Sequence, residues 1–256
     1  MSLIELKDIH KSFYGVEVLH GVNFVLQSGS VHALMGENGA GKSTLMKCLF
    51  GIYDKDSGKI ELEGKEINFK NSKEALENGV AMVHQELNQA LKRNVMDNLW
   101  LGRYPKVGGV MVNEKKIYDD TKKVFEELKI DVDPKRIMST MPVSQRQMVE
   151  IAKAVSADCK VLILDEPTSG LDPVSRDELL KILSEYIEDG EHSVLFSTHI
   201  TGDLERAADY ITYISYGELY FTGSKDDFVD MFRIVKGGIE ELSDDLKNKA
   251  AGIRTF

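Results

Sequence analysis

The sequence has 256 residues, of which 42% are hydrophobic and 29% are charged, a balance typical of a globular protein with a packed core. This length predicts one large domain or two small lobes. Asp and Glu outnumber Lys and Arg by 42 to 32, which gives a formal net charge of −10. General binding to nucleic acid or to anionic membranes needs an excess of Lys and Arg, so we expect no nucleic-acid partner and no direct membrane insertion.

The lengths of the apolar runs, the N-terminal segment and the number of cysteines exclude further classes of protein. The longest apolar runs are strand-sized and far shorter than the roughly 18 residues of a membrane span, and the N-terminal segment mixes charged with apolar residues, unlike a signal peptide. The two cysteines, Cys48 and Cys159, are too few for a disulfide framework or a metal cluster. Each lies among apolar neighbours, so we expect two buried thiols in a cytoplasmic protein.

The first 86 residues show mainly strand patterns. Apolar and polar residues alternate around Ile4 and Leu6 and again from Val22 to Leu26, which is the period of a half-covered strand. Residues 31–35 form a short apolar run typical of a buried strand, and a glycine-rich loop and a helix over 43–50 follow. The pattern then predicts a hairpin over 58–69 and another buried strand over 79–84.

Residues 87–155 are predicted to be mostly helical, with a loop at 104–109. Strand patterns return at 161–164 and 193–197, on either side of a helix with one apolar face. The order predicts an α/β fold with a mainly parallel core sheet, an N-terminal antiparallel β part and an inserted helical subdomain. We expect the core to comprise residues 1–86 and 156–222, the insert residues 87–155, and a C-terminal tail residues 223–256. The tail is either a helix that docks on a partner or a solvated end.

The loop after the third predicted strand matches the pattern G-x-x-x-x-G-K-[S/T] and lies between a buried strand and a helix. Its glycines allow backbone N–H groups to surround phosphate oxygens, and the helix N-terminus adds positive potential. We expect Lys42 to reach the β- and γ-phosphates and Ser43 to bind Mg²⁺. The candidate nucleotide-binding residues are Gly36, Glu37, Asn38, Gly39, Ala40, Gly41, Lys42, Ser43 and Thr44.

A second phosphate-linked element is the pair Asp165 and Glu166, which directly follows the apolar run 161–164. A carboxylate at the end of a buried strand is placed to hold Mg²⁺, directly or through water. The next carboxylate can then polarise the attacking water as a general base. A strand that simply runs into solvent is the alternative interpretation, and the neighbouring phosphate loop disfavours it.

These residues resemble the nucleotide-binding domain of ABC (ATP-binding cassette) ATPases over roughly residues 3–222. The resemblance implies a P-loop NTPase fold, ATP and Mg²⁺ as ligands, and hydrolysis of ATP between two cassettes. It also implies that Phe13 stacks on adenine, with Tyr14 as the competing candidate. Gln85, in Val-His-Gln-Glu after a strand, resembles the glutamine that senses Mg²⁺ and couples the site to a transmembrane partner.

Two further motifs extend the resemblance toward the C-terminus. Residues 169–172, Ser-Gly-Leu-Asp, are similar to the loop that crosses the dimer interface, and His199 at a strand end resembles the switch histidine that contacts the γ-phosphate. The resemblance therefore implies Glu166, His199 and Lys42 as the catalytic set. The implied metal set is Ser43, Gln85 and Asp165.

One motif departs from the family pattern. The family signature is Leu-Ser-Gly-Gly-Gln, whereas residues 141–145 are Met-Pro-Val-Ser-Gln. Pro142 replaces the serine and supplies neither a hydroxyl nor an N–H group, and Val143 places a side chain where a glycine is expected. Ser144 and Gln145 remain candidates for contact with nucleotide. The hypothesis that follows is a symmetric homodimer with two weakened sites.

The branch of the family differs between the two parts of the chain. Residues 1 to about 165 resemble carbohydrate-importer ATPases, and the remainder resembles single-cassette exporter ATPases, so a recombined sequence and an unusual natural branch both stay open. The leading expectation is a transporter ATPase, with carbohydrate import as its use, that binds transmembrane subunits at the inner face of the cell membrane and pairs with a second cassette, as a homo- or heterodimer. The alternatives are a drug or peptide exporter ATPase, a soluble ABC ATPase, and a pairing module with weak turnover.

Overall fold

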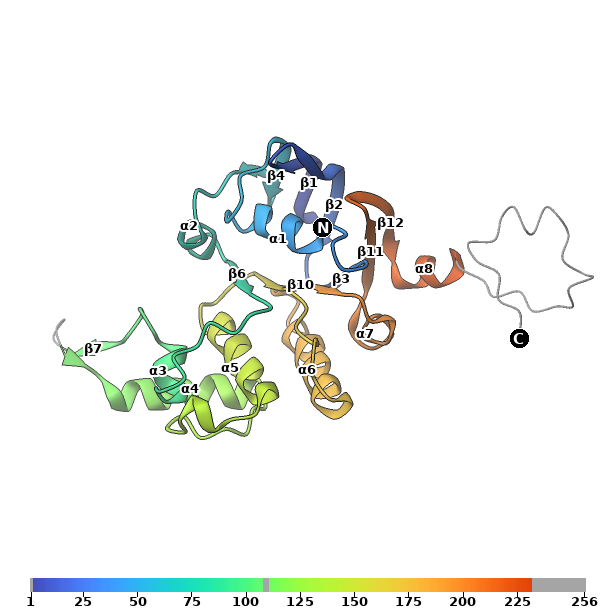
Figure 1. The fold of residues 1–256 in the computed structure, drawn as a ribbon. Helices are drawn as coiled ribbons and strands as arrows, with labels where there is room; N and C mark the ends of the chain where they lie inside the picture. The colour runs from blue at the N-terminus through green and yellow to red at the C-terminus, as the bar shows by residue number, and fades with distance from the viewer. Residues whose placement is uncertain (1, 108–110, 232–256) are drawn as a thin grey trace, which may run out of the picture.

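A four-stranded antiparallel sheet forms the N-terminal part of the computed structural model, which describes residues 2–107 and 111–231 (Figure 1). Its strand order is β2-β1-β4-β5. The long strands β1 and β2 alternate buried and exposed residues over much of their length, so one face packs on the core. The bounds are β1 Ser2–Phe13, β2 Val16–Gln27, β4 Ser57–Leu62 and β5 Lys65–Ile67. The predicted hairpin over 58–69 is the pair β4–β5.

A six-stranded sheet forms the centre of the molecule, in the order β12-β11-β3-β10-β9-β6. Every neighbouring pair is parallel except β11–β12, which is antiparallel at the edge. The prediction of a mainly parallel core sheet with an antiparallel N-terminal part is therefore confirmed. The bounds are β3 Val31–Met35, β6 Val80–Val83, β9 Val161–Leu164, β10 Ser193–Thr198, β11 Tyr210–Ser215 and β12 Glu218–Ser224.

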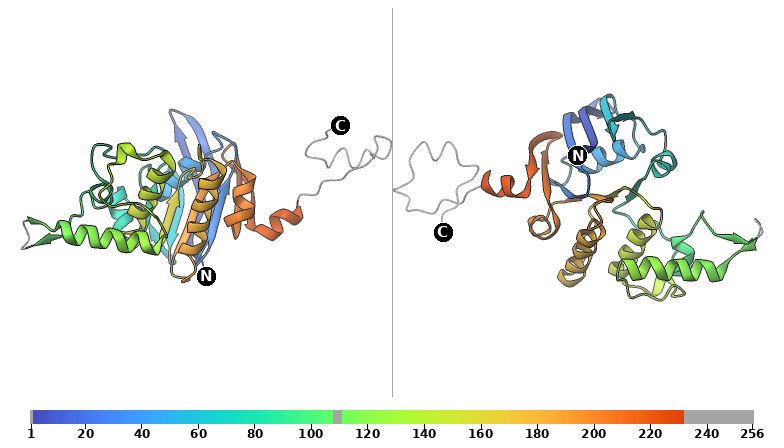
Figure 2. Two further views of the ribbon diagram at one scale, coloured as in Figure 1. Left: turned by 90° about the horizontal axis from the view of Figure 1, so that it is seen from below. Right: turned by 180° about the vertical axis from the view of Figure 1, so that it is seen from behind.

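Helices pack on both faces of this sheet. Helix α1 (Lys42–Leu49) lies between the two sheets, where Leu45 and Met46 join the same core as Ile4 and Phe24. Helices α5 (Val143–Val155), α6 (Pro173–Tyr186) and α7 (Thr201–Ala207) contribute to the core on the opposite face, as Figure 2 shows from two further directions. The short helix α2 (Ser72–Glu77) precedes β6. Cys48 and Cys159 are both buried and free, as expected.

The helical part between β6 and β9 has a core of its own. Helices α3 (Val95–Leu99), α4 (Glu114–Glu127), the 3₁₀ turn Met138–Thr140 and the inner face of α5 enclose it. The loop expected at 104–109 is wrong in part, because β7 (Lys106–Val107) pairs with β8 (Met111–Val112) as a small hairpin. The two strands are only two residues each, too short for a periodic signal in the sequence.

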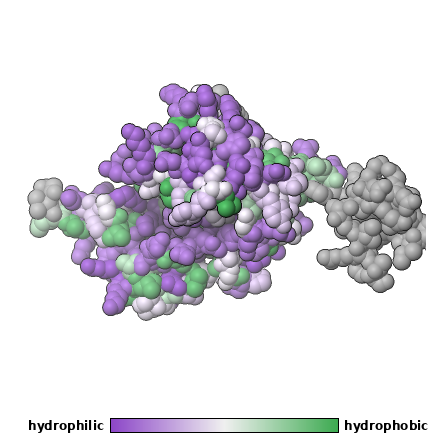
Figure 3. Space-filling model, turned by 45° about the horizontal axis from the view of Figure 1, so that its top comes forward, coloured by the Kyte–Doolittle hydropathy of each residue, from purple (hydrophilic) through white to green (hydrophobic). Residues whose placement is uncertain are grey.

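The C-terminal end of the described chain packs on the core sheet. Strand β12 runs to Ser224, past the boundary expected at residue 222, and α8 (Lys225–Met231) follows directly. The ring of Phe228 meets that of Phe221 edge-on at 5.1 Å, and the Lys225 N–H donates to the Asp209 carbonyl. The start of the expected tail is thus part of the folded core, and the rest of the tail, residues 232–256, lies outside the described residues. The face in Figure 3 is mostly hydrophilic, with hydrophobic residues in small groups.

Candidate nucleotide site

The site is assembled at the carboxyl ends of four adjacent parallel strands. Strand β3 leads into the glycine-rich loop, β10 ends next to His199, β9 ends next to Asp165, and β6 ends two residues before Gln85. In spatial order these strands are β3, β10, β9 and β6. Because the carboxyl ends of parallel strands share one edge, segments distant in sequence meet there, as is usual for ligand sites in α/β sheets.

The glycine-rich loop borders a cavity of about 380 Å³. Gly39 and Gly41 have φ angles of +84° and +105°, a left-handed conformation that residues with a Cβ rarely adopt. The start of the loop is tightly packed against β11. A Cβ atom added to Gly36 would lie only 2.2 Å from the carbonyl oxygen of Ile214. The lining residues are Val18, Asn38, Gly39, Ala40, Gly41, Lys42, Ser43, Thr44, Gln85 and Glu166.

Lys42 supplies a positive charge to this cavity. Its side chain is only 4% exposed, and Nζ donates to the carbonyl oxygens of Gly36 at 2.7 Å and Glu37 at 3.0 Å. Nζ also lies 3.5 Å from Glu166 Oε1. The loop thus fits a phosphate chain, because its backbone is free to turn N–H groups toward the cavity and its one buried ammonium group lies at the cavity wall.

The expected metal ligands meet next to the loop. Ser43 Oγ donates to Asp165 Oδ1 at 2.9 Å, and Gln85 Nε2 donates to Glu166 Oε2 at 3.1 Å. Among the described residues, no group of three or more His, Cys, Asp or Glu side chains could hold a metal ion without help. Mg²⁺ is usually held by one or two protein oxygens together with substrate phosphates and water, so a serine hydroxyl next to a single aspartate fits Mg²⁺ bound with a nucleotide.

The Glu166 side chain contacts three other side chains of the site. Its carboxylate is 10% exposed and lies within 3.6 Å of His199 Nδ1, in addition to its contacts with Lys42 and Gln85. Its backbone has a φ angle of +46°, which is unusual for a residue with a side chain and costs about 1–3 kcal/mol. The Ser197 hydroxyl accepts from the Glu166 N–H at 2.8 Å. The neighbouring segments therefore hold a strained residue in place.

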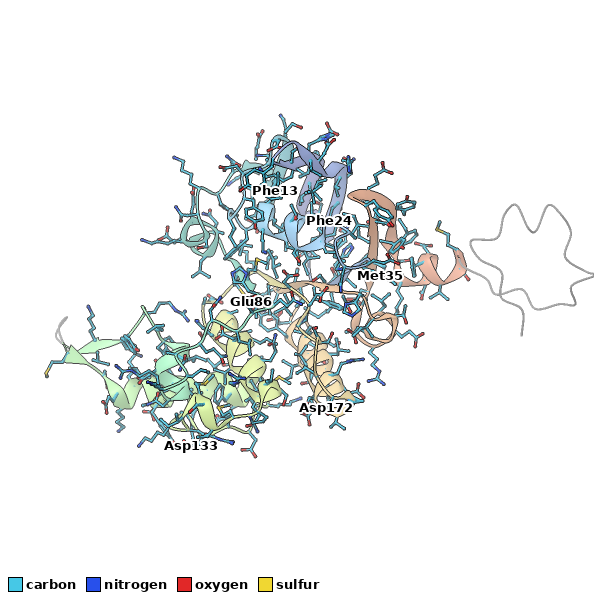
Figure 4. The ribbon with its side chains drawn as sticks, in the orientation of Figure 1. Phe13, Phe24, Met35, Glu86, Asp133 and Asp172 are labelled. Atoms are coloured by element: carbon cyan, nitrogen blue, oxygen red, sulfur yellow. The ribbon has the colours of Figure 1, made fainter. Side chains whose placement is uncertain are left out.

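Three expected nucleotide contacts are not among the residues that line this cavity. Phe13 is on the antiparallel sheet (Figure 4), and its ring meets that of Tyr53 edge-on at 5.1 Å. Tyr14 is fully exposed in the turn that follows. Ser144 and Gln145 are in the first turn of α5 and do not line the cavity. Gln145 Oε1 accepts from the Arg136 guanidinium at 3.1 Å instead.

The departure in the signature segment is visible at the start of α5. Pro142 occupies the N-cap position and no side chain caps the helix. Val143 follows with its side chain half exposed. Pro142 and Val143, the two exposed residues at this helix start, are therefore apolar and lack the hydroxyl that the family pattern places there.

Sequence reasoning missed Ser197, whose hydroxyl joins the two carboxylate residues of the site. It donates to Asp165 Oδ1 at 2.9 Å while it accepts from the Glu166 backbone. The signal was present in the sequence, since a serine and a threonine end an otherwise apolar run before His199, and buried hydroxyls need hydrogen-bond partners. Which residues are those partners depends on β9, the strand beside β10, because Asp165 and Glu166 follow it.

The fold and the site together define a P-loop nucleotide-binding domain with an inserted helical part. The family model "ABC transporter" matches residues 19–169, more than half of the sequence, and the chain belongs to this family. A domain of this family binds ATP. The helices of the described residues all lack the length and hydropathy that a membrane-spanning segment needs.

Two relatives are similar to the chain. It is 53% identical over 216 residues to the galactose/methyl galactoside import ATP-binding protein MglA of Fusobacterium nucleatum, and 49% identical over 249 residues to that of Clostridium perfringens. These matches cover 84% and 97% of this chain but 43% and 48% of the relatives, so the chain spans about half the length of the curated relatives it matches. The match to the Clostridium perfringens protein covers 97% of the chain. A single import protein is therefore similar to both the importer-like part before about residue 165 and the exporter-like part after it.

Solved structures show the same fold. A crystal structure of the ADP conformation of an ATP-binding cassette of an ABC transporter superposes with a TM-score of 0.81 at 24% identity, and covers 90% of this chain and 94% of that one. The structure of cbiO1 from Clostridium perfringens, part of the ABC transporter complex cbiONQ, superposes with a TM-score of 0.78 at 26% identity, and covers 90% and 92% of the two chains. The expected P-loop NTPase fold is thereby confirmed.

Proposed function

We propose that the chain is an ATP-hydrolysing cassette that powers a membrane transporter, and that this transporter imports a carbohydrate. The observation that carries the ATPase proposal is the Glu166 carboxylate, held beside the nucleotide cavity by Lys42, Gln85 and His199. The carbohydrate proposal rests on the import proteins named above, which are about half identical to the chain. Residues 36–44 bind the phosphates, and Phe13 stacks on the adenine ring.

The side chains divide the chemistry of hydrolysis among them. Lys42 neutralises charge on the terminal phosphates, and Ser43, Asp165 and Gln85 hold Mg²⁺, which when bound neutralises phosphate charge further. Glu166 accepts the proton of the attacking water, for which a nearly buried carboxylate beside the cavity is suited. His199, at 3.6 Å from that carboxylate, orients the γ-phosphate from the next strand.

The partners follow from the same proposal. Residues 87–155 form the insert that contacts transmembrane subunits, the remaining described residues form the ATPase core, and the cassette lies on the inner face of the membrane through those subunits. Glu86, directly after Gln85, lies at the junction of the core and the insert (Figure 4). This position of Gln85 supports coupling between the nucleotide site and the insert. The ATP site is completed by a second cassette.

The second cassette is proposed to differ from this one. A proline at the start of α5 and an exposed valine after it leave a γ-phosphate of the opposite cassette without the expected hydroxyl and N–H donors. Two copies of this chain would therefore close weakly on ATP. A partner with an intact signature would complete the site formed by Lys42 and Glu166.

The proposal is tested by phosphate release from Mg-ATP by the wild-type chain and by Glu166→Gln. We expect release to fall by about 10²-fold or more, because a general base contributes typically 10²–10⁴-fold. Because the site needs a second cassette, equal rates contradict the ATPase proposal when the protein is dimeric with Mg-ATP, and they then favour a pairing module. For the partner, the molar mass of Glu166→Gln in solution is measured with and without Mg-ATP. A monomer at saturating ATP supports a different partner cassette, and a dimer supports self-pairing.

The cargo needs a separate experiment. The chain is combined in vesicles with transmembrane subunits encoded beside it, and transport of labelled galactose is compared with that of a labelled peptide. ATP-dependent galactose uptake supports the import proposal. Peptide transport without galactose uptake would contradict it.

A further inference from the structure

We propose that Asp203 is a positioning residue for ATP hydrolysis, because its buried carboxylate ties the segment of Glu166 to the segment of His199. The inference rests on the proposed ATPase function. Asp203 lies in the first turn of α7, outside every motif of the sequence, and is 0% exposed. Its role therefore comes only from the contacts that its two oxygens make.

One carboxylate oxygen joins the two segments. Asp203 Oδ2 accepts from Thr168 Oγ1 at 2.7 Å and from Thr198 Oγ1 at 2.9 Å. Thr168 is two residues after Glu166, and Thr198 directly precedes His199. Both threonines are 1% exposed, so water does not replace these bonds. One oxygen atom thus fixes the distance between the two hydroxyl groups. Because each threonine is at most two residues from a site residue, the same bonds also limit the distance between Glu166 and His199.

The strained backbone of Glu166 explains why such a tie is needed. A residue with a φ angle of +46° keeps this conformation only when the surrounding structure over-determines it. On its N-terminal side, Ser197 accepts from the Glu166 N–H. On its C-terminal side, the Ser169 N–H donates to the Glu166 carbonyl at 3.1 Å, and the Thr168 bond to Asp203 anchors that turn to α7.

The other carboxylate oxygen argues against a role in stability alone. Asp203 Oδ1 has no hydrogen-bond partner, and the nearest cation, Arg176 Nε, is 3.9 Å away and also lacks one. A buried carboxylate with an incomplete ion pair is a poor source of stability compared with an apolar residue. The buried charge of Asp203 is therefore explained by its two short hydrogen bonds, to Thr168 and Thr198.

Arg176 lies near this carboxylate but makes no hydrogen bond to it. Arg176 is in the first turn of α6, just after residues 169–172, and its side chain is 27% exposed. Its guanidinium faces the buried carboxylate across the contact between α6 and α7.

The test compares Thr168→Val and Asp203→Ala with a control in the same pair of helices. Thr168→Val removes one hydroxyl with almost no change of shape. The control is Arg206→Gln, which removes the ion pair between Arg206 of α7 and Asp177 of α6 and leaves the two threonine bonds in place. Steady-state phosphate release, ATP binding by calorimetry and thermal unfolding are measured for each.

We expect kcat to fall by about 10- to 100-fold in Thr168→Val and Asp203→Ala, because a displacement near 1 Å costs about 10²-fold in rate. KM and the ATP dissociation constant should change less than about 3-fold, since the phosphate loop is untouched. Asp203→Asn, which keeps one acceptor oxygen, should recover part of the rate that Asp203→Ala loses. Arg206→Gln should keep the wild-type rate.

Several outcomes would overturn the inference. They are wild-type kcat in folded Thr168→Val or Asp203→Ala, an equal loss in Arg206→Gln, or parallel rises in KM and in the ATP dissociation constant with kcat unchanged. If Asp203→Ala does not fold, Thr168→Val decides the question. Failure of the ATPase proposal itself is recognised separately, because Glu166→Gln and the wild type would then release phosphate at the same rate.

Discussion

Replacement of Gly36 by alanine tests whether the nucleotide cavity depends on close contact between the phosphate loop and β11. The added Cβ would lie 2.2 Å from the Ile214 carbonyl oxygen and 3.2 Å from the Ala40 Cβ. Cβ contacts under 3.0 Å are essentially never seen, so the loop or the strand must move by at least 3.0 − 2.2 = 0.8 Å. The blocking atom belongs to the backbone of a core strand, which yields less easily than a side chain.

The magnitude follows from two known effects. Insertion of one extra carbon into a packed site costs about 1–3 kcal/mol, so we expect the free energy of unfolding to fall by about 2 kcal/mol. The shift also displaces the carbonyl oxygen of Gly36 that accepts from Lys42 Nζ at 2.7 Å. The ammonium group of Lys42 is then no longer held where it reaches the phosphates. One hydrogen bond to a charged group is worth about 1.5–3 kcal/mol, so loss of the bond from Lys42 to phosphate should lower affinity for Mg-ATP by about 10-fold or more.

Gly64→Ala is the matched control. Gly64 lies in the turn between β4 and β5 with a φ angle of +74°, and nothing lies within 4 Å of its added Cβ, so alanine there adds backbone strain of roughly 1–2 kcal/mol without a clash. Urea unfolding and calorimetric titration with Mg-ATP are compared for the two variants. We expect Gly64→Ala to lose stability but to keep its ATP affinity. Wild-type ATP affinity in Gly36→Ala would refute the reasoning.

Three further predictions concern other parts of the molecule. Burial lowers the pKa of His32 from 6.5 to about 3, so between those pH values the unfolded chain binds a proton that the folded chain does not. The free energy of unfolding should therefore be about 2 kcal/mol lower at pH 5 than at pH 7.5 on this account, and His32→Gln should remove that difference in urea titrations; an unchanged slope would contradict it. Burial raises the pKa of the Cys48 thiol to about 11, so iodoacetamide at pH 8 should label Cys48 only after urea unfolding, as read by mass spectrometry, and rapid labelling of the folded protein would show the thiol to be accessible. Phe13→Ala should weaken ATP binding by about 5- to 150-fold, because ring stacking on a base is worth about 1–3 kcal/mol, whereas Tyr14→Ala should bind ATP as the wild type does; the reverse order in fluorescence titrations would assign the adenine contact to Tyr14.

Short segments of the sequence are enough to identify the local parts of the site. The phosphate loop is specified by glycines and a lysine within eight residues, and the carboxylate pair by an apolar run that ends in two acidic residues. The structure places Lys42 and Glu166 3.5 Å apart. Signals of this kind survive without tertiary information because turn chemistry and strand burial depend on a few neighbouring residues.

The way in which these parts meet depends on the order of the strands in the core sheet. Strands β3, β6, β9 and β10 follow one another in the sequence, yet β10 lies between β3 and β9, and this order brings His199 beside Glu166. No local pattern encodes that order, because it depends on the packing of helices on both faces of the sheet. The contacts of Ser197 and Asp203, and the packing of residues 223–231, come from the same long-range arrangement. The residue types that do the chemistry are therefore readable from short segments, whereas their distances are set by strand order and by burial across the whole core.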